Sequence, residues 1–161
     1  MVIAPGNALP HAKFKTMTAT GPSEVSTDEL FNGKKAVLFA VPGAFTPTCH
    51  VKHLPGFVQH AADFKAKGVD LIACTSVNDV FVLHAWAKAS GARDTVTFLA
   101  DGNGDFAKSI GLEMDGAPSG LGIRSKRYAM LVEDGVVKAL HVEDTPRNAV
   151  ESSAERLLAD L

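Results

Sequence analysis

One cysteine, Cys49, occupies a position where reactive sulfur chemistry is favoured. It follows an apolar run, Ala36 to Val41, which is typical of a buried strand, and precedes an amphipathic run, Val51 to Lys67, which is typical of a helix. The first turn of a helix has unpaired backbone N–H groups that favour an anion, and the thiolate is the reactive form of cysteine. Thr46, three residues earlier, can place a hydroxyl beside the sulfur. The pattern predicts a nucleophilic thiol, although a small buried structural cysteine is the simpler alternative.

The loop that carries Cys49 should be rigid. Pro42, Gly43 and Pro47 lie between the expected strand and the expected helix, and prolines restrict the backbone. Further along, Pro55 and Gly56 fall inside the expected helix. Because proline removes a backbone hydrogen bond, we expect a kink or a widened turn there.

The remaining elements predict an α/β protein. Parallel crossovers come first and an antiparallel hairpin comes last, which implies a central mixed β-sheet flanked by helices, preceded by an N-terminal hairpin extension. A glycine-rich loop is expected from Met114 to Gly122, and a terminal helix from Ser152 to Leu161, with Ser152 and Glu155 forming a capping box. Further strands are expected at 13–18, 24–26, 35–41, 69–76, 96–100, 127–133 and 136–142, and further helices from Ser26 to Gly33, from Asn78 or Asp79 to Ser90, and up to about Ile110.

Composition sets limits on the class of protein. The chain has 161 residues, which suits one domain over residues 1–161 with one core. With 46% hydrophobic residues, 21% charged residues and a net charge of −2, it has no basic field for nucleic acid and no apolar run of membrane-spanning length. Two cysteines are too few for a secreted disulfide scaffold, so we expect a reducing, cytoplasmic setting.

The full pattern Pro-x-x-x-Thr-x-x-Cys, between a strand and a helix, resembles the active-site loop of the peroxiredoxins. The longer string from Val41 to Cys49 is similar to the peroxiredoxin-5 branch, which includes the plant type II enzymes. The resemblance implies a thioredoxin-like fold and a thiol peroxidase for hydrogen peroxide and alkyl hydroperoxides, with no metal, flavin or haem cofactor. It extends over nearly the whole chain, through residues 41–49, 53–57, 76–79, 99–101 and 120–127.

The same resemblance implies roles for individual residues. Cys49 would be the peroxidatic nucleophile, which becomes a sulfenic acid. Thr46 would hydrogen-bond to the peroxide and the sulfur, Pro42 would shield the sulfur from water, and Arg127, which precedes Tyr128 and a buried strand, would contact the sulfur. Gly43, Phe45 and Leu121 would line the substrate pocket. Family members are often dimers, so we expect a homodimer, with Phe45, Val77, Phe81 and Leu121 as candidate contacts.

Several alternatives remain open for the other polar residues. Arg124 is the second candidate for the sulfur contact and could instead be structural. His50, His53 and His60 lie in or beside the Cys49 helix, so a zinc pair or a Cys/His hydrolase is conceivable, but no compact second ligand pair is visible. In the family pattern His53 is mostly structural.

The second cysteine, Cys74, lies in an apolar strand and is most simply a buried small residue. Plant type II members have a cysteine at this position that can form a disulfide with the peroxidatic one. The C-terminal segment from Asn148 to Ser153, where animal members place a resolving cysteine, has none. We therefore expect glutathione or glutaredoxin to reduce the oxidised Cys49. The alternative is reduction by thioredoxin through a Cys49–Cys74 disulfide. The alternative from another functional class is a non-enzymatic redox-sensing or binding module.

Overall fold

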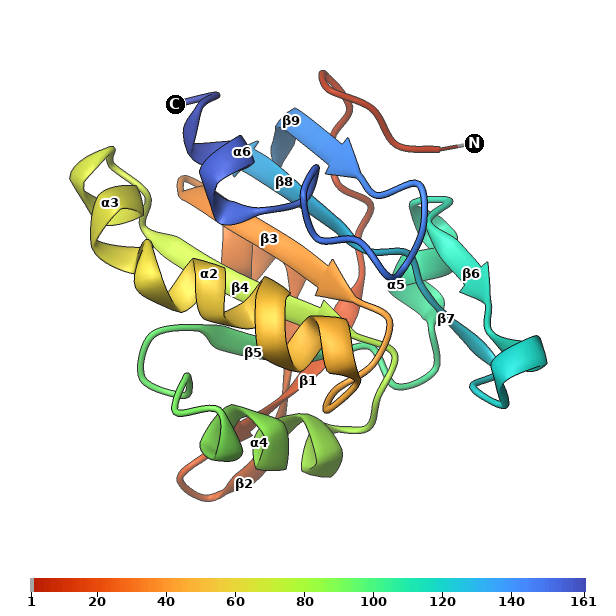
Figure 1. Ribbon diagram of the computed structural model, residues 1–161. Helices are drawn as coiled ribbons and strands as arrows, with labels where there is room; N and C mark the ends of the chain where they lie inside the picture. The colour runs from red at the N-terminus through yellow and green to blue at the C-terminus, as the bar shows by residue number, and fades with distance from the viewer. Residues whose placement is uncertain (1) are drawn as a thin grey trace.

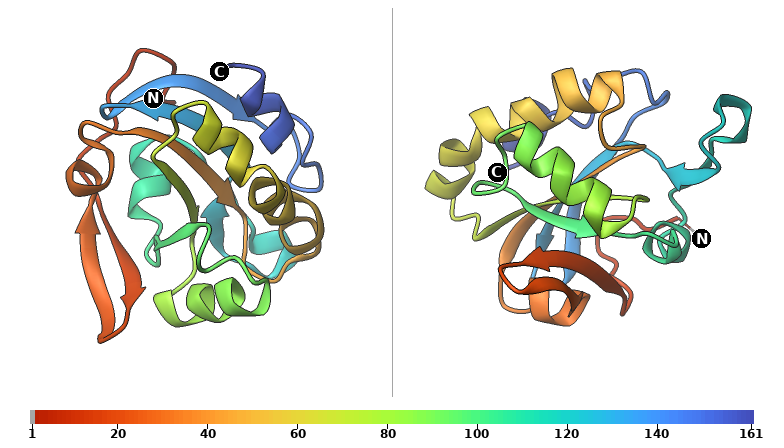
Figure 2. Two further views of the ribbon diagram at one scale, coloured as in Figure 1. Left: turned by 90° about the vertical axis from the view of Figure 1, so that its left-hand side faces the viewer. Right: turned by 90° about the horizontal axis from the view of Figure 1, so that it is seen from below.

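The computed structural model describes residues 2–161. A seven-stranded mixed sheet forms the centre, in the order β2-β1-β5-β4-β3-β8-β9, and helices cover both of its faces (Figures 1 and 2). This is the predicted arrangement, and β1 and β2 form the predicted N-terminal hairpin. The strands of this sheet are β1 Lys13–Thr18, β2 Gly21–Ser26, β3 Lys35–Val41, β4 Leu71–Ser76, β5 Thr97–Ala100, β8 Tyr128–Glu133 and β9 Val136–Val142.

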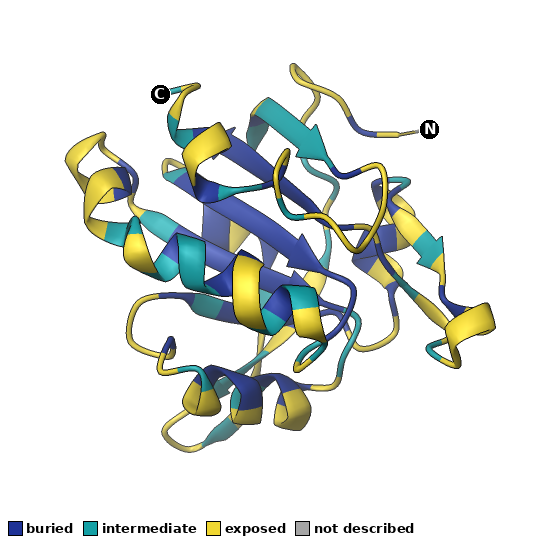
Figure 3. Ribbon diagram, viewed as in Figure 1, coloured by how far each residue is buried: buried dark blue, intermediate teal, exposed yellow. Residues whose placement is uncertain are grey.

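The two faces of the sheet are covered by different helices. On one face, alternate residues of β3 such as Val37 and Phe39 pack against the helices that follow Cys49, against α4 (Val80–Ala89) and against α6 (Ala154–Leu158). On the other face, Leu38 and its neighbours pack against the two remaining helices, α1 Thr27–Phe31 and α5 Asp105–Ser109. Because both faces are covered, the central strands are buried along their length (Figure 3).

Strand β3 fixes the position of the site. It runs parallel to β4 and antiparallel to β8, so Ala40, near its end, pairs with Tyr128 at the start of β8. The end of β3 and the start of β8 therefore meet at the same edge of the sheet. Cys49 follows the first strand and Arg127 precedes the second, which brings two distant parts of the sequence together.

The run after Cys49 is broken into three segments rather than one helix. A π-helical turn, Cys49–His53, comes first, followed by α2 Leu54–Gln59 and α3 Ala61–Ala66. The π-turn is the predicted widened turn, directly before Pro55. The break at His60 was not predicted. Its imidazole is bound by the carboxylates of Asp63 and Glu155, and Glu155 lies on a helix far away in sequence.

Two further expectations were wrong. The predicted loop from Met114 to Gly122 contains β6 Glu113–Asp115 and a 3-10 turn, Ala117–Ser119, and β6 pairs with β7 Ile123–Ser125 in a small separate arm (Figure 1). Three-residue strands are too short to show an alternating pattern in sequence. The terminal helix α6 is capped by Ser153, not by Ser152, because the carboxylate of Glu143 engages Ser152.

Candidate active site

Cys49 is fully buried at the start of the π-turn, where the loop after β3 returns to the sheet. The hydroxyl oxygen of Thr46 lies 2.9 Å from the Cys49 sulfur and 2.7 Å from the carbonyl oxygen of Gly43. One hydroxyl proton can serve only one of these acceptors at a time. The hydroxyl can therefore donate to a thiolate, or turn its proton to Gly43 and accept from a thiol.

Arg127 brings a cation to the other side of the sulfur. Its side chain is only 2% exposed, and its Nη2 donates to the Cys49 sulfur over 2.9 Å. The same guanidinium donates through Nε and Nη2 to the carbonyl oxygen of Pro146, and through Nη1 to Nδ1 of His53, 3.0 Å away. The planar fork is thereby held on three sides, and one N–H remains aimed at the sulfur.

His53 acts in this arrangement as a neutral acceptor. Its Nε2 lies 2.9 Å from the carbonyl oxygen of Ser152, which can only accept, so Nε2 carries the proton and Nδ1 is bare toward Arg127. Burial, together with the nearby guanidinium, lowers the pKa of His53 to about 3. The imidazole is therefore uncharged at neutral pH and leaves the positive charge of Arg127 uncompensated.

A hollow of about 560 Å³ lies beside these groups. Pro42, Thr46 and Arg127 line it, and Leu121 lines it from the β6–β7 arm. Phe45 does not line it: its ring is half exposed and lies near His50. The hollow is large enough for a small hydroperoxide with an apolar group. Its other lining residues are Pro47, Thr48, Met114, Asp115, Gly116, Pro118, Ser119, Pro146 and Arg147.

Gly43 also lies outside the lining of this hollow and has a packing role. A Cβ atom at Gly43 would meet Nη1 of Arg124 at 3.0 Å and Cγ2 of Thr46 at 3.1 Å. Arg124 itself donates to the carbonyl oxygens of Leu121 and Pro42, so it joins the arm to the active-site loop and does not hydrogen-bond to the sulfur.

Cys74 lies in the middle of β4, paired with Phe39 on one side and Phe98 on the other, and is fully buried. Both cysteines are free thiols. Burial is the main cause that raises the pKa of the Cys74 thiol well above its ordinary value, so this thiol is protonated at neutral pH.

Sequence reasoning did not find the residues that the connection from β9 to α6 contributes. Pro146 accepts from Arg127, Arg147 accepts from Thr48 through its carbonyl oxygen, and Ser152 accepts from His53. All three contacts use backbone carbonyl groups, which every residue type carries. The sequence therefore held no signal for them.

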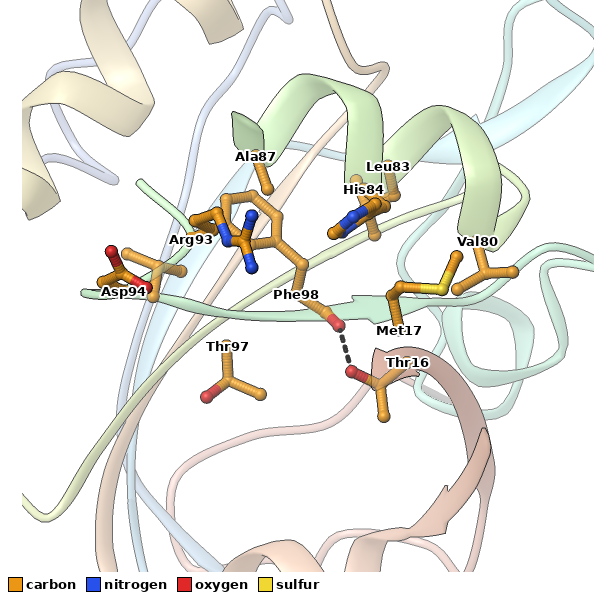
Figure 4. A pocket seen from close by; sticks show the side chains of 11 residues that line it. Thr16, Met17, Val80, Leu83, His84, Ala87, Arg93, Asp94, Thr97 and Phe98 are labelled. Carbon is orange, nitrogen blue, oxygen red and sulfur yellow. Dashed lines mark hydrogen bonds between the residues drawn. The ribbon is translucent and has the colours of Figure 1, made fainter. Parts of the chain in front are cut away.

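A second hollow, of about 250 Å³, lies between β1, α4 and β5 (Figure 4). Phe98 and Leu83 lie at its buried side, and the Thr16 hydroxyl donates to the carbonyl oxygen of Phe98 over 3.0 Å. None of the predicted site residues lines this hollow. It is separate from the sulfur chemistry.

Within residues 2–161, no group of three or more His, Cys, Asp or Glu side chains is arranged to hold a metal ion. Across the same residues, no helix has both the length and the apolar character needed to span a bilayer.

Comparison with known proteins identifies the family. Residues 4–158 match the model of the Redoxin family. The chain is 49% identical to peroxiredoxin-2E, chloroplastic, of Arabidopsis thaliana, over 99% of this chain and 69% of that protein. It superposes with a TM-score of 0.94 on the crystal structure of reduced Prx3 in complex with hydrogen peroxide from Vibrio vulnificus, at 51% identity and with 99% of both chains covered. These matches confirm the expected thioredoxin-like fold.

The comparison contradicts the expected cytoplasmic location. The Arabidopsis relative above is named as chloroplastic, and peroxiredoxin-2F of the same plant, 40% identical over 98% of this chain and 79% of that protein, is named as mitochondrial. Both of these relatives are named as organellar, so the expectation of a cytoplasmic setting is wrong. A low cysteine count identifies a reducing environment but does not distinguish one such compartment from another.

The Cys49 thiol is buried between the Thr46 hydroxyl and the Arg127 guanidinium. The fold that carries this thiol matches a solved peroxiredoxin over 99% of the chain. The chain belongs to the redoxin family and is a peroxiredoxin, a thiol-dependent peroxidase.

Proposed function

We propose that Cys49 is the peroxidatic residue and that Thr46, Arg127 and Pro42 complete its active site. The Cys49 thiolate attacks one oxygen of the hydroperoxide, the O–O bond breaks, and the other oxygen leaves as an alkoxide or hydroxide that takes up a proton. Cys49 becomes a sulfenic acid and the peroxide becomes an alcohol or water. The observation that carries this proposal is the pair of 2.9 Å contacts from Thr46 and Arg127 to one sulfur.

The arrangement supports stabilisation of the charge that moves during this step. Before the reaction the guanidinium faces the sulfur of Cys49. As the O–O bond breaks, negative charge moves to the leaving oxygen, and donors fixed in advance lower the barrier most effectively. The hydroxyl of Thr46 can shift between its two acceptors as the charge moves. Pro42, which donates no hydrogen bond, lines the hollow and excludes water from the sulfur.

We propose that an external thiol of the glutathione or glutaredoxin class completes the cycle. The sulfenic acid condenses with one thiol to a mixed disulfide and water, and a second thiol releases the Cys49 thiol and a disulfide of the reductant. The position of Cys74 supports this route. Its thiol is protonated and buried between two strands, whereas attack on the sulfenic acid needs an accessible thiolate. This chemistry calls for no metal, flavin or haem.

The intact mass of the reduced protein after one equivalent of hydrogen peroxide, without reductant, tests both proposals. We expect the gain of one oxygen, trapped at Cys49 by a sulfenic-acid reagent, and no gain in Cys49→Ser. The matched variant Cys74→Ser should turn over at the wild-type rate with glutathione and glutaredoxin. Loss of two hydrogens within one chain, abolished in Cys74→Ser, would instead establish the thioredoxin-type disulfide.

We also propose that the protein forms a homodimer through the rim of its active site. Phe45 and Phe81 are 49% and 65% exposed, and Phe45 lies on the active-site loop itself. Large exposed aromatic side chains are typical of interfaces. Phe81→Asp should shift the mass measured by light scattering from dimer to monomer, whereas Val150→Asp, at an equally exposed apolar residue near α6, should leave it unchanged.

A further inference from the structure

Glu143 is a buried carboxylate that the proposed chemistry does not use. It follows β9 directly and is only 7% exposed. Its backbone N–H donates to the carbonyl oxygen of Arg127 over 3.0 Å. Within residues 2–161, no Lys, Arg or His nitrogen lies within 4.0 Å of its carboxylate, so the charge is not held in an ion pair. Burial of an unpaired carboxylate is costly unless hydrogen bonds satisfy it.

Among the described residues, Ser152 alone donates hydrogen bonds to this carboxylate. Oε2 of Glu143 accepts from the backbone N–H of Ser152 over 2.5 Å and from its hydroxyl over 2.6 Å. Ser152 is fully buried, so the carboxylate fixes both its backbone and its side chain. The carbonyl oxygen of this same residue accepts from Nε2 of His53.

A continuous chain of buried contacts therefore leads to the sulfur. Ser152 selects the His53 tautomer that carries its proton on Nε2, and the bare Nδ1 accepts from Nη1 of Arg127. Nη2 is then left to face Cys49. No carboxylate of the described part of the chain lies within 4.0 Å of this guanidinium. The neutral imidazole of His53 thus orients the plane of the Arg127 guanidinium and does not neutralise its positive charge, which faces the Cys49 sulfur.

We propose that Glu143 and Ser152 are positioning residues, which orient the Arg127 guanidinium toward Cys49 by fixing the tautomer and ring position of His53. The inference rests on the role proposed above for Arg127. The same contacts could serve only to attach α6 to the sheet. The two roles differ in what they predict for His53, which a purely structural anchor would leave unchanged.

Three variants separate the two roles. Glu143→Ala removes the acceptor of both Ser152 groups. Glu143→Gln retains one amide oxygen that can take the place of Oε2 and accept both hydrogen bonds. Ser153→Ala is the matched structural control, because Ser153 lies next to Ser152 and caps α6 through the N–H of Arg156 but takes no part in the chain of contacts.

The experiment records the ¹⁵N shifts of the histidine ring nitrogens at pH 7, with His53 assigned through His53→Gln, and the rate of hydrogen peroxide consumption in a single turnover. In the wild type and in Glu143→Gln we expect the Nε2–H tautomer of His53 and rates within about threefold of each other. In Glu143→Ala we expect mixed tautomers and a loss of about tenfold in rate, by analogy with the loss of a hydrogen-bond partner that orients a metal-bound histidine. Ser153→Ala should keep the wild-type tautomer and rate.

The proposal is overturned if Glu143→Ala keeps the Nε2–H tautomer and the wild-type rate. It is also overturned if Ser153→Ala reproduces the changes of Glu143→Ala, or if Glu143→Gln fails to restore them. A slow wild-type reaction with peroxide would refute the proposed role of Cys49. The tautomer comparison among the variants would still decide the role of Glu143.

Discussion

Replacement of Arg127 by alanine tests the centre of the proposed mechanism. The guanidinium donates to three acceptors: the Pro146 carbonyl oxygen, Nδ1 of His53 and the Cys49 sulfur. Only the donor that faces the sulfur acts on the reacting atoms. Removal of one donor aimed at developing charge costs about 3–4 kcal/mol, which corresponds to a rate loss of about 100- to 1000-fold. We expect a loss of this size for Arg127→Ala.

The variant Arg127→Lys separates charge from geometry. Lysine keeps the positive charge, but its single nitrogen cannot reach all three acceptors at once. We expect its loss to be smaller, about 10- to 100-fold. Because His53 is buried, loss of its donor leaves Nδ1 unsatisfied and should lower the free energy of unfolding by about 1–3 kcal/mol in Arg127→Ala.

Competition with horseradish peroxidase for hydrogen peroxide measures the second-order rate constant without any reductant, and thermal unfolding confirms that each variant is folded. The control is Arg124→Ala, which removes the bonds to Leu121 and Pro42 but no hydrogen bond to the sulfur. We expect less than a tenfold loss for this control. If Arg127→Ala kept the wild-type rate constant while Arg124→Ala lost a hundredfold, the assignment of the two arginines would be reversed and the reasoning refuted.

Three further predictions concern packing, a buried hydroxyl and pH. Gly43→Ala should reduce the rate constant for peroxide several-fold, because the new Cβ atom would lie 3.1 Å from the Thr46 side chain and displace it. The control Gly56→Ala, whose Cβ atom would have its nearest contact at 3.9 Å, should leave this rate constant unchanged. Peroxide competition compares the two variants. The buried Tyr128 hydroxyl has no hydrogen-bond partner in the described residues. Tyr128→Phe should therefore leave the free energy of unfolding, measured in urea, unchanged or raise it by about 1 kcal/mol. A decrease of more than about 1 kcal/mol would contradict this reasoning. His53 has a pKa of about 3 in the folded protein, so near pH 6.5 only the unfolded chain takes up a proton on this residue. Its contribution to the free energy of unfolding is therefore complete above pH 6.5 and declines by up to about 1.4 kcal/mol per pH unit between pH 6.5 and 3. His53→Gln should remove this decline from the pH profile of the free energy of unfolding measured in urea.

The local part of the site could be predicted from the sequence. Cys49 and Thr46 are three residues apart in a loop with two prolines, and such short spacing largely determines which groups meet. The capping box at Ser26 and the widened turn before Pro55 also depend on neighbouring residues only, and both are present. Arg127 was reached through the family resemblance, because no local rule connects it with Cys49 across 78 positions.

The remaining features depend on contacts between distant segments. Ser152 and Ser153 are equally good capping residues in sequence, and the choice between them is made by Glu143, nine positions earlier. The arm formed by β6 and β7 consists of three-residue strands, whose pairing is fixed by each other rather than by an apolar pattern. The helix break lies at His60, whose ring contacts Glu155, 95 positions later. Local propensities carry no record of such partners.

Catalysis depends on the register in which β8 pairs with β3. Ala40 pairs with Tyr128, so the residue before β8 lies at the edge where β3 delivers the loop of Cys49. A slip of one position would turn the side chains of β8 to the opposite faces of the sheet, since side chains alternate along a strand, and would displace the backbone of Arg127, directly before β8, by about 3.4 Å. A molecule with this slipped pairing could retain most of its secondary structure and still lack the cation beside its sulfur. Peroxide turnover per molecule therefore reports how faithfully this pair of strands has assembled, a defect to which circular dichroism is nearly blind.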